Sequence, residues 1–255
     1  MITRRYLKMT GVLALIVALG FVARPACAAR QEKSPDQDVK AKIEESFKQS
    51  GLLLGNDIQV AIANKTVTLT GTVRTLAQKE QAGSAAKAAA KGFKIANDLA
   101  VAASGASPGE LAEALTTAIE KSASYFIFDY VGVDVSAAGE VVLKGWTTYP
   151  WSAKEIVKLA QSQPGVKNVK DEIQRIMIMD PDRILRNQVA LLIYIRPTGP
   201  SFSRMNGPVH IIVINGVVTL GGTVEKNTDA ESYERLIRLN TGAISVNNGL
   251  RVKSK

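Results

Sequence analysis

A strand-like stretch that ends near a glycine occurs three times in this chain, and its spacing limits the possible folds. The copies read N-K-T-V-T-L-T-G-T-V at residues 64–73, G-E-V-V-L-K-G-W-T at 139–147 and N-G-V-V-T-L-G-G-T-V at 215–224. In each, apolar and polar residues alternate after a turn residue, which is typical of a strand with one buried face. A period this long indicates tandem small domains rather than a solenoid, whose repeats run roughly 20–50 residues. The glycines shared by the copies are Gly71, Gly145 and Gly222.

The residues around each copy predict the same order of elements. In the first repeat, apolar residues four positions apart from Val39 to Phe47 predict a helix that is capped by Asp36 or Asp38. A two-residue hairpin turn is expected at 64–65, between two alternating strands. An alanine-rich helix and a short last strand complete the repeat. The predicted order is therefore α-β-β-α-β.

The same order recurs twice more, so the chain divides into three units. Unit 1 is expected at residues 36–101, unit 2 at 110–178 and unit 3 at 180–253, with a linker rich in Ala, Ser and Gly at 102–109. We predict an α+β fold of three tandem small domains. Each is a three-stranded mixed sheet covered on one face by two helices. The shared glycines point toward the helices, so a close helix approach or a bulge is the expected reason for them.

The second face of each sheet has no predicted cover. In unit 1 this face carries threonines, which suit water, whereas in unit 2 it carries Val142 and Trp146. In unit 3 it carries Ile212, Ile214 and Val217. The sequence therefore favours packing of units 2 and 3 against something, most simply each other. Coverage of these faces by loops fits the pattern equally well.

The first 29 residues have the features of an export signal and are assigned as a signal peptide, residues 1–29. Basic residues precede an apolar run at 11–23 and a small-residue site, A-C-A, at 26–28. The paired arginines allow a twin-arginine signal and Cys27 allows a lipoprotein. Lys8 argues against the first, and the Arg-Pro pair before the site argues against the second. We expect export to the periplasm with no transmembrane segment after signal removal.

The charge balance of the chain is mildly basic. The formal net charge is +9, of which the signal contributes four positive charges and no negative one, leaving +5. This excess permits an anionic partner such as a membrane surface, and ordinary solubility charge explains it as well. Cleavage after Cys27, the only cysteine, leaves no disulfide, so each unit is held by packing alone.

The sequence contains no pattern that predicts catalysis or a cofactor. His210 is the only histidine, which excludes a histidine-based triad and a multi-histidine metal site. Its position in an alternating strand predicts a structural, solvent-touched side chain on the open sheet face. Asp129 and Asp134 lack a partner pattern, and no phosphate-binding or dinucleotide loop occurs. Nucleic-acid motifs are also missing. We expect no enzyme, no metal and no cofactor.

Two stretches are candidates for binding. The first, residues 145–151, holds both tryptophans of a chain that is poor in aromatic residues. Trp and Tyr favour interfaces because one end is apolar and the other forms hydrogen bonds. The alternative is that these rings only pack against residues 125–130. The second stretch is the loop at 196–208, for which disorder is the alternative. The candidate contacts are Trp146, Tyr149, Trp151, Arg196, Phe202 and Arg204.

The repeats resemble the BON domain, the module of osmotically inducible periplasmic proteins. The resemblance rests on x-V-x-L-x-G-x-V after a hairpin, then a helix, then an ending like G-V-x-x-V-x-N-x-L. Those endings are G-F-K-I-A-N-D-L at 92–99, G-V-K-N-V-K-D-E-I at 165–173 and G-A-I-S-V-N-N-G-L at 242–250. Unit 2 departs most, with Trp146-Thr147 in place of a Thr-Val pair. The resemblance implies a non-enzymatic envelope protein with a role in phospholipid binding and envelope integrity.

These observations together predict an exported binding protein of the bacterial envelope. Contact with anionic phospholipid surfaces, in envelope maintenance or stress, is the favoured function. The alternative is a protein-interaction or self-association module that uses the open sheet faces of units 2 and 3, in which case the protein is an oligomer. We expect no nucleic-acid partner.

Overall fold

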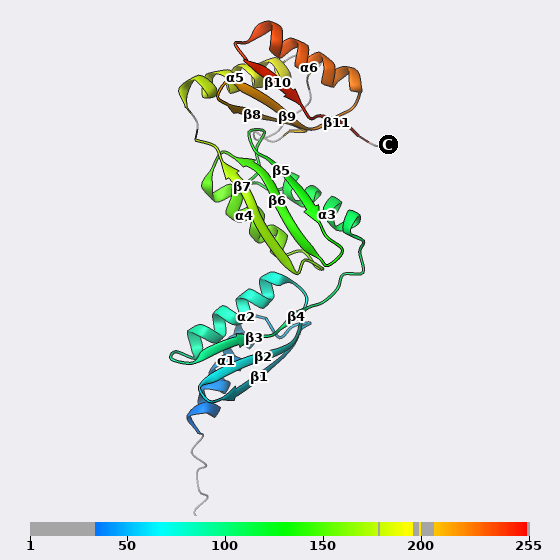
Figure 1. Ribbon diagram of the computed structural model, residues 1–255. Helices are drawn as coiled ribbons and strands as arrows, with labels where there is room; N and C mark the ends of the chain where they lie inside the picture. The colour runs from blue at the N-terminus through cyan, green and yellow to red at the C-terminus, as the bar shows by residue number, and fades with distance from the viewer. Residues whose placement is uncertain (1–33, 178, 196–198, 200–206, 254–255) are drawn as a thin grey trace, which may run out of the picture.

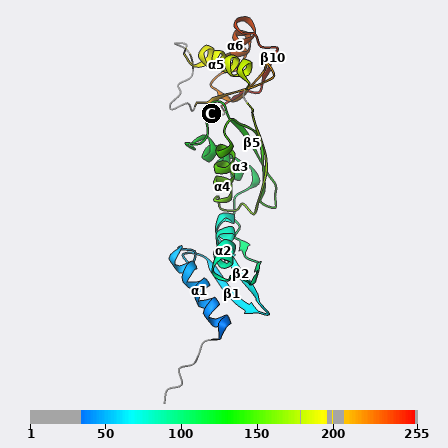
Figure 2. The ribbon, with the colours of Figure 1, turned by 90° about the vertical axis from the view of Figure 1, so that its left-hand side faces the viewer.

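Three α-β-β-α-β units follow one another along an elongated molecule (Figures 1 and 2). The structure is a computed structural model that describes residues 34–177, 179–195, 199 and 207–253. The expected signal peptide and Cys27 lie outside these residues. Figure 2 shows helices α1 to α4 on one side of the molecule and the strands of units 1 and 2 on the other.

The described residues form six helices and three mixed sheets, which confirms the predicted α+β fold. Unit 1 contains α1 (Pro35–Gln49), β1 (Asp57–Ala63), β2 (Thr66–Val73), α2 (Leu76–Ala89), β3 (Lys94–Asn97) and β4 (Ala100–Val101). Unit 2 contains α3 (Pro108–Glu120), β5 (Tyr130–Val135), β6 (Glu140–Thr147), α4 (Pro150–Gln161) and β7 (Asn168–Arg175). Unit 3 contains α5 (Asp180–Tyr194), β8 (Val209–Ile214), β9 (Val217–Val224), α6 (Asn227–Asn240), β10 (Ser245–Asn248) and β11 (Arg251–Val252).

In each sheet the strand of the repeated motif lies in the middle. It pairs antiparallel with the first strand of its unit and parallel with the last. The last strand is continuous in unit 2 and divided into two short strands in units 1 and 3. The hairpin turn at Asn64 and Lys65 has φ values of 50° and 57°, as a two-residue turn of type I′ requires. Asn215 and Gly216 form the same turn in unit 3, with φ values of 51° and 74°.

The repeated glycines are required by the neighbouring strand, and the expected helix approach or bulge is wrong. Gly71, Gly145 and Gly222 have φ values of 112°, 135° and 97°, a region that favours glycine. A Cβ atom at Gly71 would overlap the carbonyl oxygen of Asp57 at the start of β1, and the other two meet equivalent carbonyls. The pairing register runs unbroken through all three positions, so no bulge is present there.

Each unit buries its own aliphatic core between the two helices and one face of the sheet. The first helix begins earlier than expected. Ser34 caps it through a capping box with Gln37, and Pro35 occupies the first turn, so neither Asp36 nor Asp38 is the cap. Pro150 occupies the first turn of α4, where its fixed φ suits a helix start.

Unit 1 contacts unit 2 through their second helices. Leu76, the first residue of α2, is 8% exposed and belongs to the hydrophobic core of unit 2. Further along, the Gln161 Nε2 of α4 donates to the Glu80 Oε1 of α2 over 2.9 Å. Among the described residues no helix is long and apolar enough to cross a membrane.

Candidate functional site at the junction of units 2 and 3

The segment between α3 and β5 docks on unit 3. Ile127 is 2% exposed and is part of the hydrophobic core of unit 3, although it belongs to unit 2 in sequence. Its carbonyl oxygen accepts from the Ile211 N–H over 2.7 Å, at the outer edge of β8. Units 2 and 3 therefore pack against each other, as expected. The contact is made mainly by this segment rather than by two sheet faces.

His210 lies inside this contact, so the expectation of a solvent-touched side chain is wrong. His210 is 2% exposed, and the centroids of the His210 and Tyr125 rings are 4.7 Å apart. Its Nδ1 donates to the Phe126 carbonyl over 3.1 Å. Tyr130 covers the same sheet face at Gly221, the residue paired with His210. Burial lowers the pKa of His210 to about 4, so the imidazole is neutral at pH 7.

A buried carboxylate fixes the shape of the docking segment. Asp129 is fully buried and accepts from the Phe126 N–H over 3.0 Å and from the Thr148 N–H over 2.6 Å. Burial raises the pKa of Asp129, while these hydrogen bonds act in the opposite direction. The carboxylate thus ties the start of β5 to the end of β6 and acts as a structural group. The sequence gives no sign of this role because both donors are backbone groups.

Arg186 of α5 reaches the same place from unit 3. Its Nη1 donates to the Thr148 Oγ1 over 3.3 Å, and its guanidinium carbon lies 4.1 Å from the Phe128 ring centroid. This is a cation–π arrangement between the two units. Burial lowers the pKa of Arg186. Sequence reasoning missed this residue, since one arginine among many exposed ones carries no distinguishing pattern.

Three rings at the rim of this contact form what we call the aromatic surface, defined by Phe126, Tyr149 and Trp151. Tyr149 stacks on Trp151 with centroids 5.3 Å apart and ring planes at 17°. Phe126 meets both edge-on, at 6.0 Å and 5.8 Å. The two outer rings are each 47% exposed. Packing against residues 125–130 is therefore present, and it still leaves half of each outer ring in contact with solvent.

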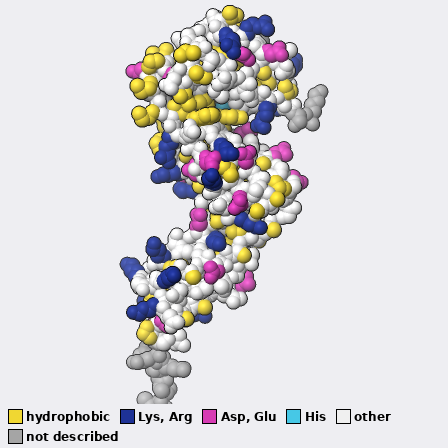
Figure 3. All heavy atoms as spheres, in the orientation of Figure 1, with side chains coloured by type: hydrophobic (Ala, Val, Ile, Leu, Met, Phe, Trp, Pro, Cys, Tyr) yellow, Lys and Arg dark blue, Asp and Glu magenta, His cyan; other side chains and the backbone are white. Residues whose placement is uncertain are grey.

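Further apolar side chains are exposed close to α5. Met177 and Met179, in the connection from unit 2, are 84% and 62% exposed. Ile184 and Leu191 of α5 and its C-cap residue Ile195 are each more than half exposed. Figure 3 shows hydrophobic side chains gathered over the part of the molecule where α5 lies. The contact between Thr148 and Arg186 places the aromatic surface beside this helix.

Trp146 does not join the aromatic surface. It lies on the open face of the unit 2 sheet, where its Nε1 donates to the Gln174 Oε1 over 3.1 Å. A groove of about 390 Å³ beside it is also lined by Lys144 and Glu172. Lys144 is paired with Asp134 over 3.2 Å, so this face is polar and charged around the indole. The candidates Arg196, Phe202 and Arg204 lie outside the described residues.

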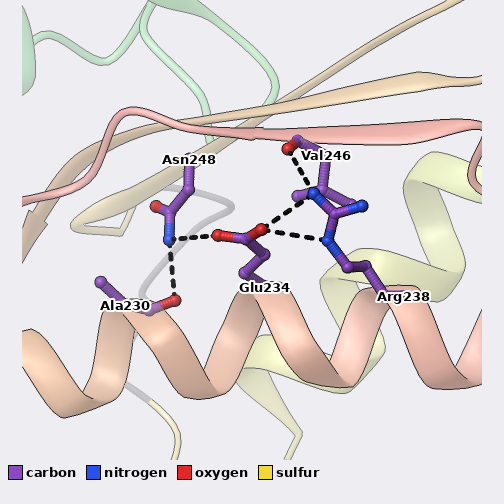
Figure 4. A network of polar contacts seen from close by, with 5 residues as sticks. All are labelled: Ala230, Glu234, Arg238, Val246 and Asn248. Atoms are coloured by element: carbon purple, nitrogen blue, oxygen red, sulfur yellow. Dashed lines mark hydrogen bonds and ion pairs between the residues drawn. The ribbon is translucent and has the colours of Figure 1, made fainter.

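A polar network in unit 3 explains the asparagine of the repeated ending (Figure 4). Asn248 Nδ2 donates to the Ala230 carbonyl over 2.9 Å and to the Glu234 Oε2 over 3.3 Å, joining β10 to α6. Arg238 holds the same carboxylate, and its hydrogen bond is the main cause that lowers the pKa of Glu234. Asn97 makes the equivalent bond in unit 1, where its Nδ2 donates to the Lys79 carbonyl over 2.7 Å and joins β3 to α2. The network is structural, because it fixes the last strand of the unit against its second helix.

In the described part of the chain no group of three or more His, Cys, Asp or Glu residues could hold a metal ion.

The BON domain family matches at residues 35–103, 109–176 and 203–254. The chain belongs to the BON domain family. This membership indicates a non-catalytic binding module associated with the cell envelope.

No curated protein matches this BON protein. Among solved structures it is similar to CdsD, a structural protein of the type III secretion system of Chlamydia trachomatis. The identity is 14%, the TM-score 0.24, and the match covers 85% of this chain and 92% of that one. It is also similar to the PrgH periplasmic domain, at 12% identity and a TM-score of 0.22, covering 80% and 100% of the two chains.

Proposed function

We propose that this BON protein is exported to the periplasm and binds anionic phospholipid surfaces through the aromatic surface. The observation that carries the proposal is the half-exposed stack of Tyr149 on Trp151. Phe126 contacts both rings edge-on, and Asp129 accepts a hydrogen bond from the backbone N–H of Phe126. The rings are thus held in place before any ligand arrives, which reduces the entropy lost on binding.

The chemistry of this surface suits the boundary between headgroups and acyl chains. Trp and Tyr concentrate at that depth because their rings are apolar and their polar atoms remain hydrated. Lys154 follows Trp151 by three residues on α4, where an exposed cation attracts anionic headgroups. The charge of +5 outside the signal adds a long-range attraction that salt weakens.

Co-sedimentation with vesicles tests the proposal. We expect the chain from residue 30 to sediment with vesicles that contain phosphatidylglycerol, more strongly at low salt, and only weakly with pure phosphatidylcholine. The double variant Tyr149→Ser/Trp151→Ser should lose about tenfold or more in partition, because the two residues are each only half exposed and together contribute roughly 1.5–3 kcal/mol when they leave water. The matched control is Trp146→Ser, which removes an indole from another face and should bind as the wild type does. Equal loss in both variants would refute the aromatic surface as the contact.

Self-association is the second candidate function. Val142 and Trp146 are only partly buried on the open face of the unit 2 sheet, which no described helix covers. Self-association predicts a dimer that is insensitive to salt and no sedimentation with vesicles. On unit 3 this use is restricted, because Tyr125 and Tyr130 already lie over His210 and Gly221.

A further inference from the structure

Unit 1 carries a loop with two exposed leucines that lies away from the junction of units 2 and 3. We call it the leucine loop, residues 50–56, between α1 and β1. Leu54 at its tip is 78% exposed and Leu53 is 41% exposed, whereas Leu52 is buried at 2% in the core of unit 1. The loop therefore anchors one leucine and presents two.

The backbone of the leucine loop is held by hydrogen bonds on both sides. Helix α1 ends in a Schellman motif: the Leu52 N–H donates to the Phe47 carbonyl over 2.9 Å, and Gly51 has a φ of 71°. The Leu54 N–H then donates back to the Gly51 carbonyl over 3.0 Å. Asn56 closes the loop, because its Nδ2 donates to the Leu52 carbonyl over 2.7 Å and its Oδ1 accepts from the Arg74 N–H over 2.9 Å. Exposure of the two leucines is thus a property of an ordered loop.

The equivalent segment of unit 2 is already a contact element. It lies between the first helix and first strand of its unit, as the leucine loop does, and it inserts Ile127 into unit 3. In unit 1 the corresponding residues, Leu53 and Leu54, are not covered by any other unit in the described part of the chain. The segment at this position of the repeat thus contacts the next unit in unit 2, whereas in unit 1 its apolar residues remain exposed.

The surroundings of the leucine loop fit a lipid surface rather than a protein. Lys48 and Arg74 flank it, both exposed, and neither forms an ion pair with a described residue. The Arg74 side chain runs along Gly55, since a Cβ atom there would lie 3.5 Å from the Arg74 Cδ. Two leucine side chains fall far short of the roughly 800 Å² per partner of a standard protein interface. An apolar tip between cations instead resembles the contacts that amphipathic segments make with anionic lipids.

We propose that the leucine loop is a second membrane contact, so that the elongated molecule lies along an anionic bilayer and touches it at unit 1 as well as at the aromatic surface. This rests on the proposed function. Two linked contacts on one chain bind more tightly than either alone, because the second event occurs at high effective concentration.

The test uses the chain from residue 30, which contains every described residue and no cysteine. A Leu54→Cys variant carries an environment-sensitive fluorophore, and Leu239→Cys, at a residue that is 76% exposed in unit 3, is the matched control. With phosphatidylglycerol vesicles we expect the label at position 54 to brighten and the label at 239 to stay unchanged. A label at 54 that stays unchanged while the chain sediments with the vesicles overturns the proposal.

A second variant measures the contribution to binding without a label. Leu53→Ser/Leu54→Ser should lower vesicle partition roughly tenfold, which corresponds to about 1.4 kcal/mol. Unchanged partition overturns the loop contact and leaves the aromatic surface intact. A change in dimerisation with unchanged partition overturns it in favour of a protein partner. If the wild type does not bind vesicles at all, both proposals fall.

Discussion

The protonation of His210 gives the junction of units 2 and 3 a defined pH dependence. Burial lowers the pKa of this imidazole to about 4 in the folded state, whereas an exposed histidine in the unfolded chain titrates near 6.5. The unfolded state therefore binds the proton first as pH falls. Stability contributed by His210 is complete above about pH 6.5 and is lost progressively down to about pH 4. The difference of about 2.5 pKa units corresponds to roughly 3 kcal/mol.

A variant that cannot titrate isolates this contribution. His210→Asn keeps an amide donor close to where Nδ1 meets the Phe126 carbonyl, so the free energy of unfolding is compared between the two proteins from pH 7 to pH 4 by urea titration. We expect the wild type to lose about 3 kcal/mol relative to the variant over this range. Asp129 acts in the opposite direction, since its raised folded-state pKa favours the folded state as pH falls, but it is common to both proteins. A difference curve that is flat, or an NMR titration of the one histidine near pH 6.5, would refute the burial argument.

Two further changes test how the units are built and joined. Ile127→Ala removes a unit 2 side chain from the core of unit 3 and should lower the free energy of unfolding by about 2–5 kcal/mol, with faster proteolysis between the units. Leu239→Ala, at an exposed residue, is the control. Equal effects of the two substitutions would contradict the docking role of Ile127. Gly222→Ala places a Cβ atom against the Pro208 carbonyl at a φ of 97° and should cost at least about 2 kcal/mol in urea unfolding. Gly242→Ala, which meets no atom within 4 Å, should be nearly neutral, and the reasoning fails if the two alanines behave alike.

Features that depend on neighbouring residues in sequence could be predicted. The alternation of Val67 and Leu69 with threonines set the strand and its buried face, and the turn at Asn64 and Lys65 set the hairpin register. The sequence alone does not identify the helix cap, because Asp36 and Asp38 are as suitable for capping as Ser34. Only the hydrogen bonds of Ser34 in the structure distinguish it.

Features that depend on contacts between units could not be predicted. The alternation of the strand residues predicts that His210 lies on the open sheet face. The residues next to His210 in sequence do not indicate that Tyr125 and Tyr130 cover that face. Asp129 resembles any other acid in the sequence, since its partners are backbone N–H groups. The two tryptophans are five residues apart in sequence, yet the turn into α4 sends them to different surfaces.

The central claim is that the aromatic surface enters the membrane interface, and the fluorescence of single tryptophans tests it most directly. Trp146→Phe leaves Trp151 as the one reporter, and Trp151→Phe leaves Trp146. On addition of phosphatidylglycerol vesicles at low salt, we predict a blue shift of Trp151 emission and quenching by brominated acyl chains, with little change for Trp146. Vesicle binding with no shift at Trp151, or a shift confined to Trp146, would contradict the claim.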